Sequence, residues 1–223
     1  MGKSLLMIFV KNPEMGKVKT RLAKTIGNNS ALLVYKHLLQ YTKNTALELG
    51  LDRHVYYSNF IDPYDLWDNN VFRKYKQEEG DLGFRMKSAF EGAFEEGYEK
   101  VVVIGSDCYE LDAASIEDAF KRLDTNDCVV GPANDGGYYL LGMRQFTPEL
   151  FEGIVWSTDQ VYPTTLAKCE AQKLSVASLK EMTDIDEFCD IEKFDDLVDL
   201  VANEIDYLKT QEGWEPCPSA KVL

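Results

Sequence analysis

The sequence predicts a single-domain α/β fold: a three-layer α/β/α sandwich whose sheet is mixed but mostly parallel. Three observations lead to this prediction. The chain has 223 residues, the size of one ordinary domain, and 45% of them are hydrophobic, enough to bury a core. The near-continuous apolar run at residues 4–10 is typical of a central strand buried on both faces. Strand-like and helix-like segments then alternate along the chain, as they do around parallel sheets.

The elements are predicted in the following order. A polar, basic stretch at residues 11–29 follows the first strand, and a helix then runs from Ser30, its cap, to about Leu49, with Gly50 ending it. Further strands are predicted at residues 54–57, 72–76, 101–104, 128–130, 138–143 and 174–179. Further helices are predicted at residues 82–96, 112–123, 159–172 and 191–208. We expect residues 1–210 to form the domain and residues 211–223, with two prolines, to be an extended surface tail.

Charge and cysteine content exclude several classes of protein. With 24 Lys+Arg against 38 Asp+Glu, the net charge of −14 disfavours binding to nucleic acid or to an anionic membrane surface. The longest apolar run is too short to span a bilayer. The five cysteines are scattered, with no CxxC pair, so we expect reduced thiols in a cytoplasmic protein and neither a disulfide framework nor a zinc site.

Two missing features argue against a catalytic triad and against a nicotinamide cofactor. His37 and His54 are the only histidines, and neither lies near a candidate nucleophile, so both are interpreted as structural and not as members of a catalytic triad. The GxGxxG pattern of nicotinamide-binding proteins is also missing.

The loop after the first strand, residues 11–24, concentrates five cations in an acidic protein. In parallel sheets the ligand lies at the carboxyl ends of the strands, and Lys and Arg side chains there bind phosphate oxygens. The loop lacks the P-loop pattern, and a solvated basic loop is the simpler interpretation, but its position favours anion binding. The candidate residues are Lys11, Gly16, Lys19, Thr20, Arg21 and Lys24.

Carboxylates follow two other predicted strands. Asp107 comes just after the strand at residues 101–104, where a carboxylate is a common ligand for Mg²⁺ or Mn²⁺, although a turn or helix cap explains it equally well. Asp184 and Asp186 occupy alternate positions after the last strand, and each is a candidate second ligand or a helix cap. We take Asp107 and Asp186 as the predicted metal pair, with Asp184 as the alternative to Asp186.

The loop after the strand at residues 128–130 carries a third candidate set. Asp135, Gly136, Gly137 and Tyr138 are consistent with an ordinary turn, and equally with a polar and aromatic wall that binds an acceptor. In the second interpretation the glycines let an acceptor approach the backbone, and Asp135 orients its hydroxyl group or acts as general base.

Several ordered segments together resemble one family. They are the basic loop, residues 77–86 (QEEGDLGFRM), 105–111 (GSDCYEL), 131–142 (GPANDGGYYLLG) and 156–158 (WST). From Ser4 to about Phe194 the chain resembles the GT-A-like nucleotide-diphospho-sugar transferases grouped as DUF2064. Residues 19–22 also resemble the phospholactate guanylyltransferase family. The resemblance implies a GT-A-like, Rossmann-like fold.

The resemblance also implies roles for individual residues. The basic loop corresponds to the one that wraps the nucleotide phosphates, and Asp107 to the metal-holding aspartate, completed by Asp184 or Asp186. Two positions depart from the family pattern: Tyr109 stands where Pro is usual, and Ser106-Asp107 replaces the DxD of many glycosyltransferases. Contacts to base and ribose are implied for Gln77, Gly80, Leu82 and Gly83.

Three functions are compatible with these residues, and of them we expect glycosyl transfer. The first is glycosyl transfer from a nucleotide-diphosphate sugar to a small-molecule acceptor, with Mg²⁺ or Mn²⁺ bridging the diphosphate and Asp107. The second is transfer of a nucleotidyl group from a nucleoside triphosphate to a phosphorylated small molecule. The number of cations in the basic loop slightly favours this second reaction, whereas the absence of the Gly-rich start of the usual pyrophosphorylase loop favours the first. The third is nucleotide binding without catalysis.

Overall fold

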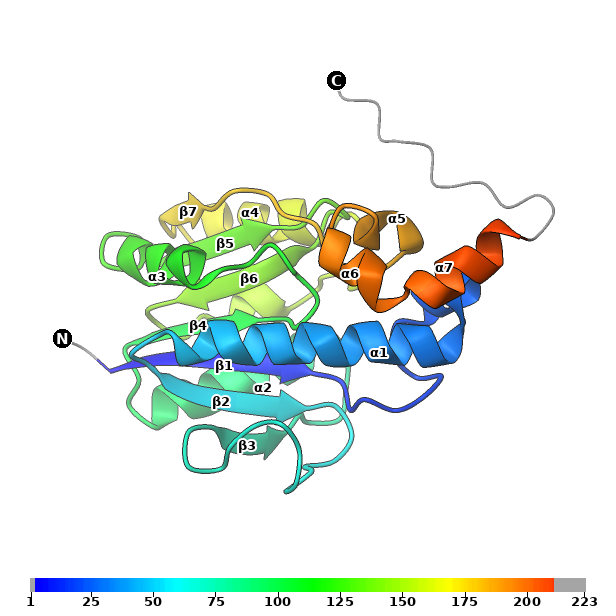
Figure 1. Cartoon of the computed structure of the whole chain (residues 1–223). Coiled ribbons are helices and arrows are strands. Elements are labelled where there is room, and N and C mark those ends of the chain that lie inside the picture. The colour runs from blue at the N-terminus through cyan, green and yellow to red at the C-terminus, as the bar shows by residue number, and fades with distance from the viewer. Residues whose placement is uncertain (1–2, 211–223) are drawn as a thin grey trace.

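The computed structural model describes residues 3–210 of the chain. Within them, a seven-stranded sheet has the strand order β3-β2-β1-β4-β6-β5-β7 (Figure 1). β6 pairs antiparallel with β4 and β5, and every other neighbouring pair is parallel. The strands are β1 (Ser4–Val10), β2 (Asp52–Tyr57), β3 (Arg73–Lys76), β4 (Lys100–Ile104), β5 (Cys128–Pro132), β6 (Tyr138–Met143) and β7 (Val176–Ser178).

Helices cover both faces of this sheet. On the face toward the viewer of Figure 1 lie α1 (Thr20–Leu47), α3 (Ala113–Arg122), α5 (Phe188–Ile191), α6 (Asp195–Leu200) and α7 (Ala202–Lys209). The opposite face is covered by α2 (Leu82–Glu95), α4 (Val161–Ala171) and the 3-10 helix η1 (Pro148–Phe151). The predicted α/β/α sandwich with a mostly parallel mixed sheet is therefore confirmed.

The alternation of side chains along β1 explains why the sheet needs both layers. Leu6 and Ile8 pack into the cluster that includes Tyr35 of α1, whereas Leu5 and Met7 pack into the one that includes Phe90 of α2. All four β1 side chains are fully buried, as the apolar run predicted.

The first helix begins earlier than the predicted Ser30. α1 starts at Thr20, so the second half of the predicted basic loop is helical, and the backbone leaves helical geometry only at Gly27 (φ 77°, ψ 162°). Leu22 and Ile26 are buried against Ile185 and the C-terminal helices. This packing stabilises the start of α1, which the polar local sequence does not indicate.

The predicted helix at residues 191–208 is also wrong in form. Three short helices, α5 to α7, replace it, with breaks near Phe194 and at Val201. Ile191, Leu197 and Ile205 are nevertheless buried on α1, so the apolar side was predicted correctly while its continuity was not. The other predicted elements agree with the structure to within a few residues. The predicted tail at residues 211–223 lies outside the described residues.

Two further expectations concern the chain as a whole. Cys108, Cys128 and Cys169 are free and buried, but Cys189 is disulfide-bonded, so the expectation that every thiol is reduced is wrong at that position. Between residues 3 and 210, no helix is both long and apolar enough to cross a lipid bilayer.

Candidate functional site

The candidate residues meet at the edge of the sheet where β1, β4 and β5 end. Because these three strands run in the same direction, the loops that follow them emerge together. Residues 182–186 return to the same edge: Ala133 bridges to Met182, and Cys108 bridges to Asp184. The topology thus brings the basic loop, Asp107, Asp135 and Asp184 to one place, as the strand-end argument predicted.

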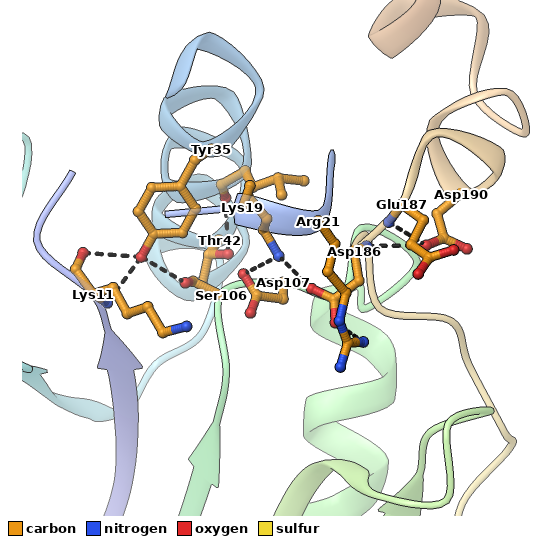
Figure 2. Close-up of polar contacts among 11 residues, drawn as sticks. Lys11, Lys19, Arg21, Tyr35, Thr42, Ser106, Asp107, Asp186, Glu187 and Asp190 are labelled. Atoms are coloured by element: carbon orange, nitrogen blue, oxygen red, sulfur yellow. Dashed lines mark hydrogen bonds and ion pairs between the residues drawn. The ribbon is translucent and has the colours of Figure 1, made fainter. Parts of the chain in front are cut away.

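Lys19 lies between two of the predicted metal ligands (Figure 2). Its Nζ is 2.7 Å from Asp107 Oδ1 and 3.4 Å from Asp186 Oδ1, and its side chain is only 3% exposed. Burial alone would lower the pKa of Lys19, but the charges of Asp107 and Asp186 outweigh it, so this pKa is raised. Lys19 therefore neutralises carboxylates in the free protein.

The backbone at Lys19 is itself unusual. With φ 47° and ψ 45°, Lys19 is a non-glycine residue in the left-handed region immediately before α1. Such a conformation is unfavourable for a residue with a Cβ and is found where the surroundings impose it, often at functional sites. Here it places a lysine side chain under the start of α1 and against Asp107.

Asp184 and Asp186 have different surroundings, which the sequence could not show. Asp186 pairs with Lys19 and, at 3.6 Å, with Arg21. Among the described residues Asp184 has neither an ion pair nor a side-chain hydrogen bond. Burial first, and then the negative charge of Asp107, raise the pKa of Asp184 to about 7; Lys19 opposes this rise, while Asp135 and Asp186 add to it.

The other residues of the basic loop remain available to a ligand. Arg21 is 64% exposed, and the side chains of Lys11, Thr20 and Lys24 are also exposed. Gly16 has a positive φ of 74°, which favours glycine there. The loop that carries these cations thus follows β1 as predicted, although the Lys19 side chain contacts carboxylates and not solvent. That the loop binds an anion stays a prediction.

Tyr35 was not among the predicted site residues, yet it joins two of the loops. Its hydroxyl group accepts from the Lys11 amide at 2.8 Å, donates to the Lys11 carbonyl at 2.9 Å and lies 3.5 Å from Ser106 Oγ (Figure 2). Burial raises the pKa of Tyr35 above its usual value, so this hydroxyl keeps its proton. The position of Tyr35 within a predicted helix gives no sign of these hydrogen bonds.

In the segment at residues 77–83, some residues stabilise the fold and others are exposed. Gln77 is buried and donates from Nε2 to the carbonyls of Tyr56, at 2.9 Å, and Val10, at 3.3 Å, so it ties the ends of β1 and β2 together. A Cβ on Gly83 would lie 2.3 Å from Trp156 Nε1, so Gly83 lets that indole pack on α2. Leu82 is 42% exposed. Gln77 and Gly80 line a hollow of about 270 Å³, whereas Leu82 and Gly83 do not.

The loop at residues 133–138 combines a tight turn with one exposed carboxylate. Asp135 Oδ1 accepts the Gly137 amide at 2.8 Å, which is a turn interaction, and Asp135 remains exposed. Gly136 has φ 84° and passes so close to Asp159 that a Cβ would lie 2.4 Å from its backbone. Tyr138 packs into the core with α2, its hydroxyl group 3.7 Å from Met86 Sδ. Of this set, Asp135 is the residue best placed to meet a ligand.

The carboxylates fit a divalent cation only as a partial ligand set. Within residues 3–210, no group of three or more His, Cys, Asp or Glu side chains is arranged to hold a metal ion by itself. Mg²⁺, however, is commonly held by one or two carboxylates together with water and substrate phosphates. Asp107 and Asp184, close enough for one to raise the pKa of the other, fit that donor set.

Comparison with known proteins identifies the family. Residues 41–158, more than half of the chain, match the family model described as "Uncharacterized protein conserved in bacteria (DUF2064)". The chain belongs to the DUF2064 family. The matched stretch of this DUF2064 protein includes Asp107 and Asp135 but not the basic loop.

Solved structures extend the comparison over most of the chain. A "putative nucleotide-diphospho-sugar transferase" from Desulfovibrio desulfuricans G20 is 36% identical, covers 84% of each chain and has a TM-score of 0.78. Two more distant structures share the fold. The inositol-1-phosphate CTP transferase from T. maritima is 15% identical, with 97% of this chain and 99% of that chain covered and a TM-score of 0.54. The 4-diphosphocytidyl-2C-methyl-D-erythritol synthase from Anaerococcus prevotii DSM 20548 is 10% identical, with 91% of this chain and 96% of that chain covered and a TM-score of 0.54. No protein of curated function matches the sequence.

Proposed function

We propose that this DUF2064 protein is a transferase with a nucleotide donor, and that it transfers a glycosyl group from a nucleotide-diphosphate sugar. The observation that carries the proposal is the convergence of exposed basic side chains and of Asp107, Asp184 and Asp186 on one edge of the sheet. A diphosphate requires cations, and the leaving diphosphate requires stabilisation as its charge develops. The 36% identity to the Desulfovibrio protein supports the same class of donor.

We assign the divalent cation to Asp107 and Asp184, in place of the pair Asp107 and Asp186 expected from the sequence. Asp186 has two positive neighbours, Lys19 and Arg21. The half-buried Asp184 lies near Asp107, and its side chain has no ion pair or hydrogen bond among the described residues. Two carboxylates in this arrangement are stabilised by a cation between them. A bound Mg²⁺ or Mn²⁺ would supply Lewis-acid stabilisation of the diphosphate leaving group.

Lys19 and the exposed cations then have separate roles in the proposal. Lys19 is held by Asp107 and Asp186 and orients those carboxylates, as its burial and its distance of 2.7 Å indicate. Lys11, Arg21 and Lys24 remain exposed and bind phosphate oxygens. The Tyr35 hydroxyl group contacts both the Lys11 backbone and Ser106, so it links the basic loop to the loop of Asp107.

Asp135 is proposed to orient the acceptor. One of its carboxylate oxygens is engaged by the Gly137 amide, which fixes the side chain and leaves the second oxygen for a ligand hydroxyl group. Its charge is among those that raise the pKa of Asp184, so it lies near the proposed donor site. A carboxylate there can hold the acceptor hydroxyl and take up its proton as the new bond forms.

Nucleotidyl transfer is the second candidate. Its support is the number of cations: with Lys11, Arg21 and Lys24 all exposed, the loop offers more positive charge than a diphosphate needs. In that reaction a phosphorylated acceptor would attack the α-phosphate of a nucleoside triphosphate, and pyrophosphate would leave.

The leaving group decides between the two reactions. The purified protein is incubated with Mg²⁺ and either nucleotide-diphosphate sugars or nucleoside triphosphates, with a panel of small hydroxyl-containing and phosphorylated acceptors. Release of nucleoside diphosphate that Asp107→Asn abolishes supports glycosyl transfer. Pyrophosphate release supports nucleotidyl transfer. Tight nucleotide binding with neither product across the panel would indicate a binding protein without catalysis and would contradict the proposal.

A further inference from the structure

A polar hollow beside the basic loop is lined by charged side chains of both signs. Lys76 and Glu79 form an ion pair there, whereas Glu78 and Arg85 form none among the described residues. The hollow has a volume of about 270 Å³ and is lined by residues that include Ser58, Asn59, Gln77, Glu78, Gly80 and Arg85. These residues follow β2 and β3 or begin α2, at the same edge of the sheet as the candidate site.

Its position continues the proposed phosphate site. Asn59 donates from its backbone to Asn12 Oδ1 at 3.0 Å and from its side chain to Glu14 at 2.9 Å. Asn12 and Glu14 belong to the basic loop that leads to Lys19. The hollow therefore adjoins the loop that is proposed to bind the nucleotide phosphates.

The walls of the hollow are held in place by the protein itself. The buried amide of Gln77 is fixed to two strand carbonyls, as described above. Gly80 adopts φ 146°, a region open to glycine, and its carbonyl accepts from Arg85 Nε at 2.9 Å. The guanidinium group is thus anchored by Nε, and in the described part of the chain its two Nη groups have no other partner.

Glu78 places a carboxylate in the same hollow as the Arg85 guanidinium group. Its side chain has no hydrogen bond or ion pair among the described residues, whereas the neighbouring Glu79 lies 3.9 Å from Lys76. Glu78 and Arg85 line the same hollow yet form no ion pair within 4.0 Å. A ligand that offers donors to a carboxylate and acceptors to an arginine fork would satisfy both.

We propose that this hollow binds a guanine base, which rests on the proposed use of a nucleotide donor. Guanine presents adjacent N–H donors, N1–H and the 2-amino group, that match the two oxygens of one carboxylate. Its O6 and N7 are the pair of acceptors that an arginine fork recognises. Adenine and uracil lack the two adjacent donors. Cytosine offers only its 4-amino group to a carboxylate, so it leaves one oxygen of Glu78 without a partner.

The test is a binding comparison on the full chain by calorimetry with Mg²⁺. GTP should bind at least about tenfold more tightly than ATP, CTP or UTP. Inosine triphosphate, which lacks only the 2-amino group, should also bind about tenfold more weakly, because it leaves one carboxylate oxygen unpaired. In Glu78→Gln this difference between GTP and inosine triphosphate should fall to about twofold or less, while Glu91→Gln, on the exposed side of α2, should preserve it.

The outcomes separate this inference from the proposed function. Equal binding of all four nucleotides, a preference for CTP, or an unchanged ratio of GTP to inosine triphosphate in Glu78→Gln would overturn the guanine assignment and leave the proposed function standing. Absence of any nucleotide or nucleotide-sugar binding by the folded protein would overturn both. Unfolding curves of Glu78→Gln that match the parent exclude a folding defect as the cause of its change.

Discussion

Lys19 Nζ lies 2.7 Å from Asp107 Oδ1, and the lysine side chain is only 3% exposed. The two residues come from loops that follow neighbouring strands, β1 and β4. Burying a lysine and a carboxylate together requires desolvation of both charges. Removing either partner leaves the other charge uncompensated and destabilises the folded protein. Asp184, which lies near Asp107, forms no such ion pair among the described residues.

Lys19→Met should destabilise the metal-free protein by roughly 1–3 kcal/mol, because it leaves Asp107 partly buried without its cation. Urea unfolding at pH 8 measures the change. The double variant Lys19→Met, Asp107→Asn should recover part of the loss, since it removes the charge as well as its partner. If the single and double variants are equally unstable, the ion pair is not the cause.

Asp184→Asn should stabilise the free protein at pH 8 by roughly 1–3 kcal/mol, because the charged form of Asp184 is disfavoured by burial and by Asp107. The pKa of Asp184 is raised from 3.8 to about 7 in the folded protein. The stability that the protonated Asp184 side chain contributes is therefore fully present below pH 3.8 and is lost as the pH rises to 7. Asp186→Asn is the matched control and should not stabilise. A loss of stability in Asp184→Asn would contradict the account.

His54 should give the opposite pH dependence. Burial lowers the pKa of His54 from 6.5 to about 4, so the unfolded chain takes up a proton first as the pH falls. Stability is therefore full above pH 6.5 and decreases toward pH 4, by at most roughly 3 kcal/mol. His54→Gln should remove this decrease. Because Asp184 acts in the other direction over part of this range, the test is the difference between parent and variant, measured by urea unfolding from pH 8 to pH 4.5. A difference that does not change with pH would refute it.

Arg21→Ala should weaken binding of nucleotide by tenfold or more and change stability by less than about 0.5 kcal/mol. Arg21 is 64% exposed and lies 3.6 Å from Asp186, so little of the fold depends on it, whereas a phosphate contact through arginine is strong. Calorimetry and urea unfolding give the two numbers. Lys36→Ala, an exposed cation farther along α1, should leave nucleotide affinity unchanged. Equal affinity in Arg21→Ala and the parent would remove the basic loop from the site.

The sequence predicted the fold where local pattern and tertiary packing agree. The strand at residues 138–143 was predicted to the residue, because its apolar side chains fill both faces of the sheet. The start of α1 was missed, since Leu22 and Ile26 become buried only through contacts with Ile185 and the C-terminal helices. Such contacts join distant parts of the chain and leave no periodic signal.

Some features of the candidate site follow from the direction of the strands, and others depend on backbone and side-chain geometry. The edge that gathers Asp107, Asp135 and the basic loop follows from strand direction, which the sequence reveals. The pairing of Lys19 with Asp107, and hence the difference between Asp184 and Asp186, depends on a left-handed backbone at Lys19 and on side-chain direction. Neither can be inferred from residue type.

The central claim is that Asp107 and Asp184 hold a divalent cation together with the phosphates of a nucleotide. Mn²⁺ binding, followed by electron paramagnetic resonance in the presence of saturating nucleoside diphosphate, tests it on the parent, Asp107→Asn, Asp184→Asn and Asp186→Asn. The account predicts that the parent and Asp186→Asn bind Mn²⁺ with affinities within about threefold of each other, and that Asp107→Asn and Asp184→Asn lose at least about tenfold. Loss in Asp186→Asn with retention in Asp184→Asn, or equal binding by all four proteins, would contradict it.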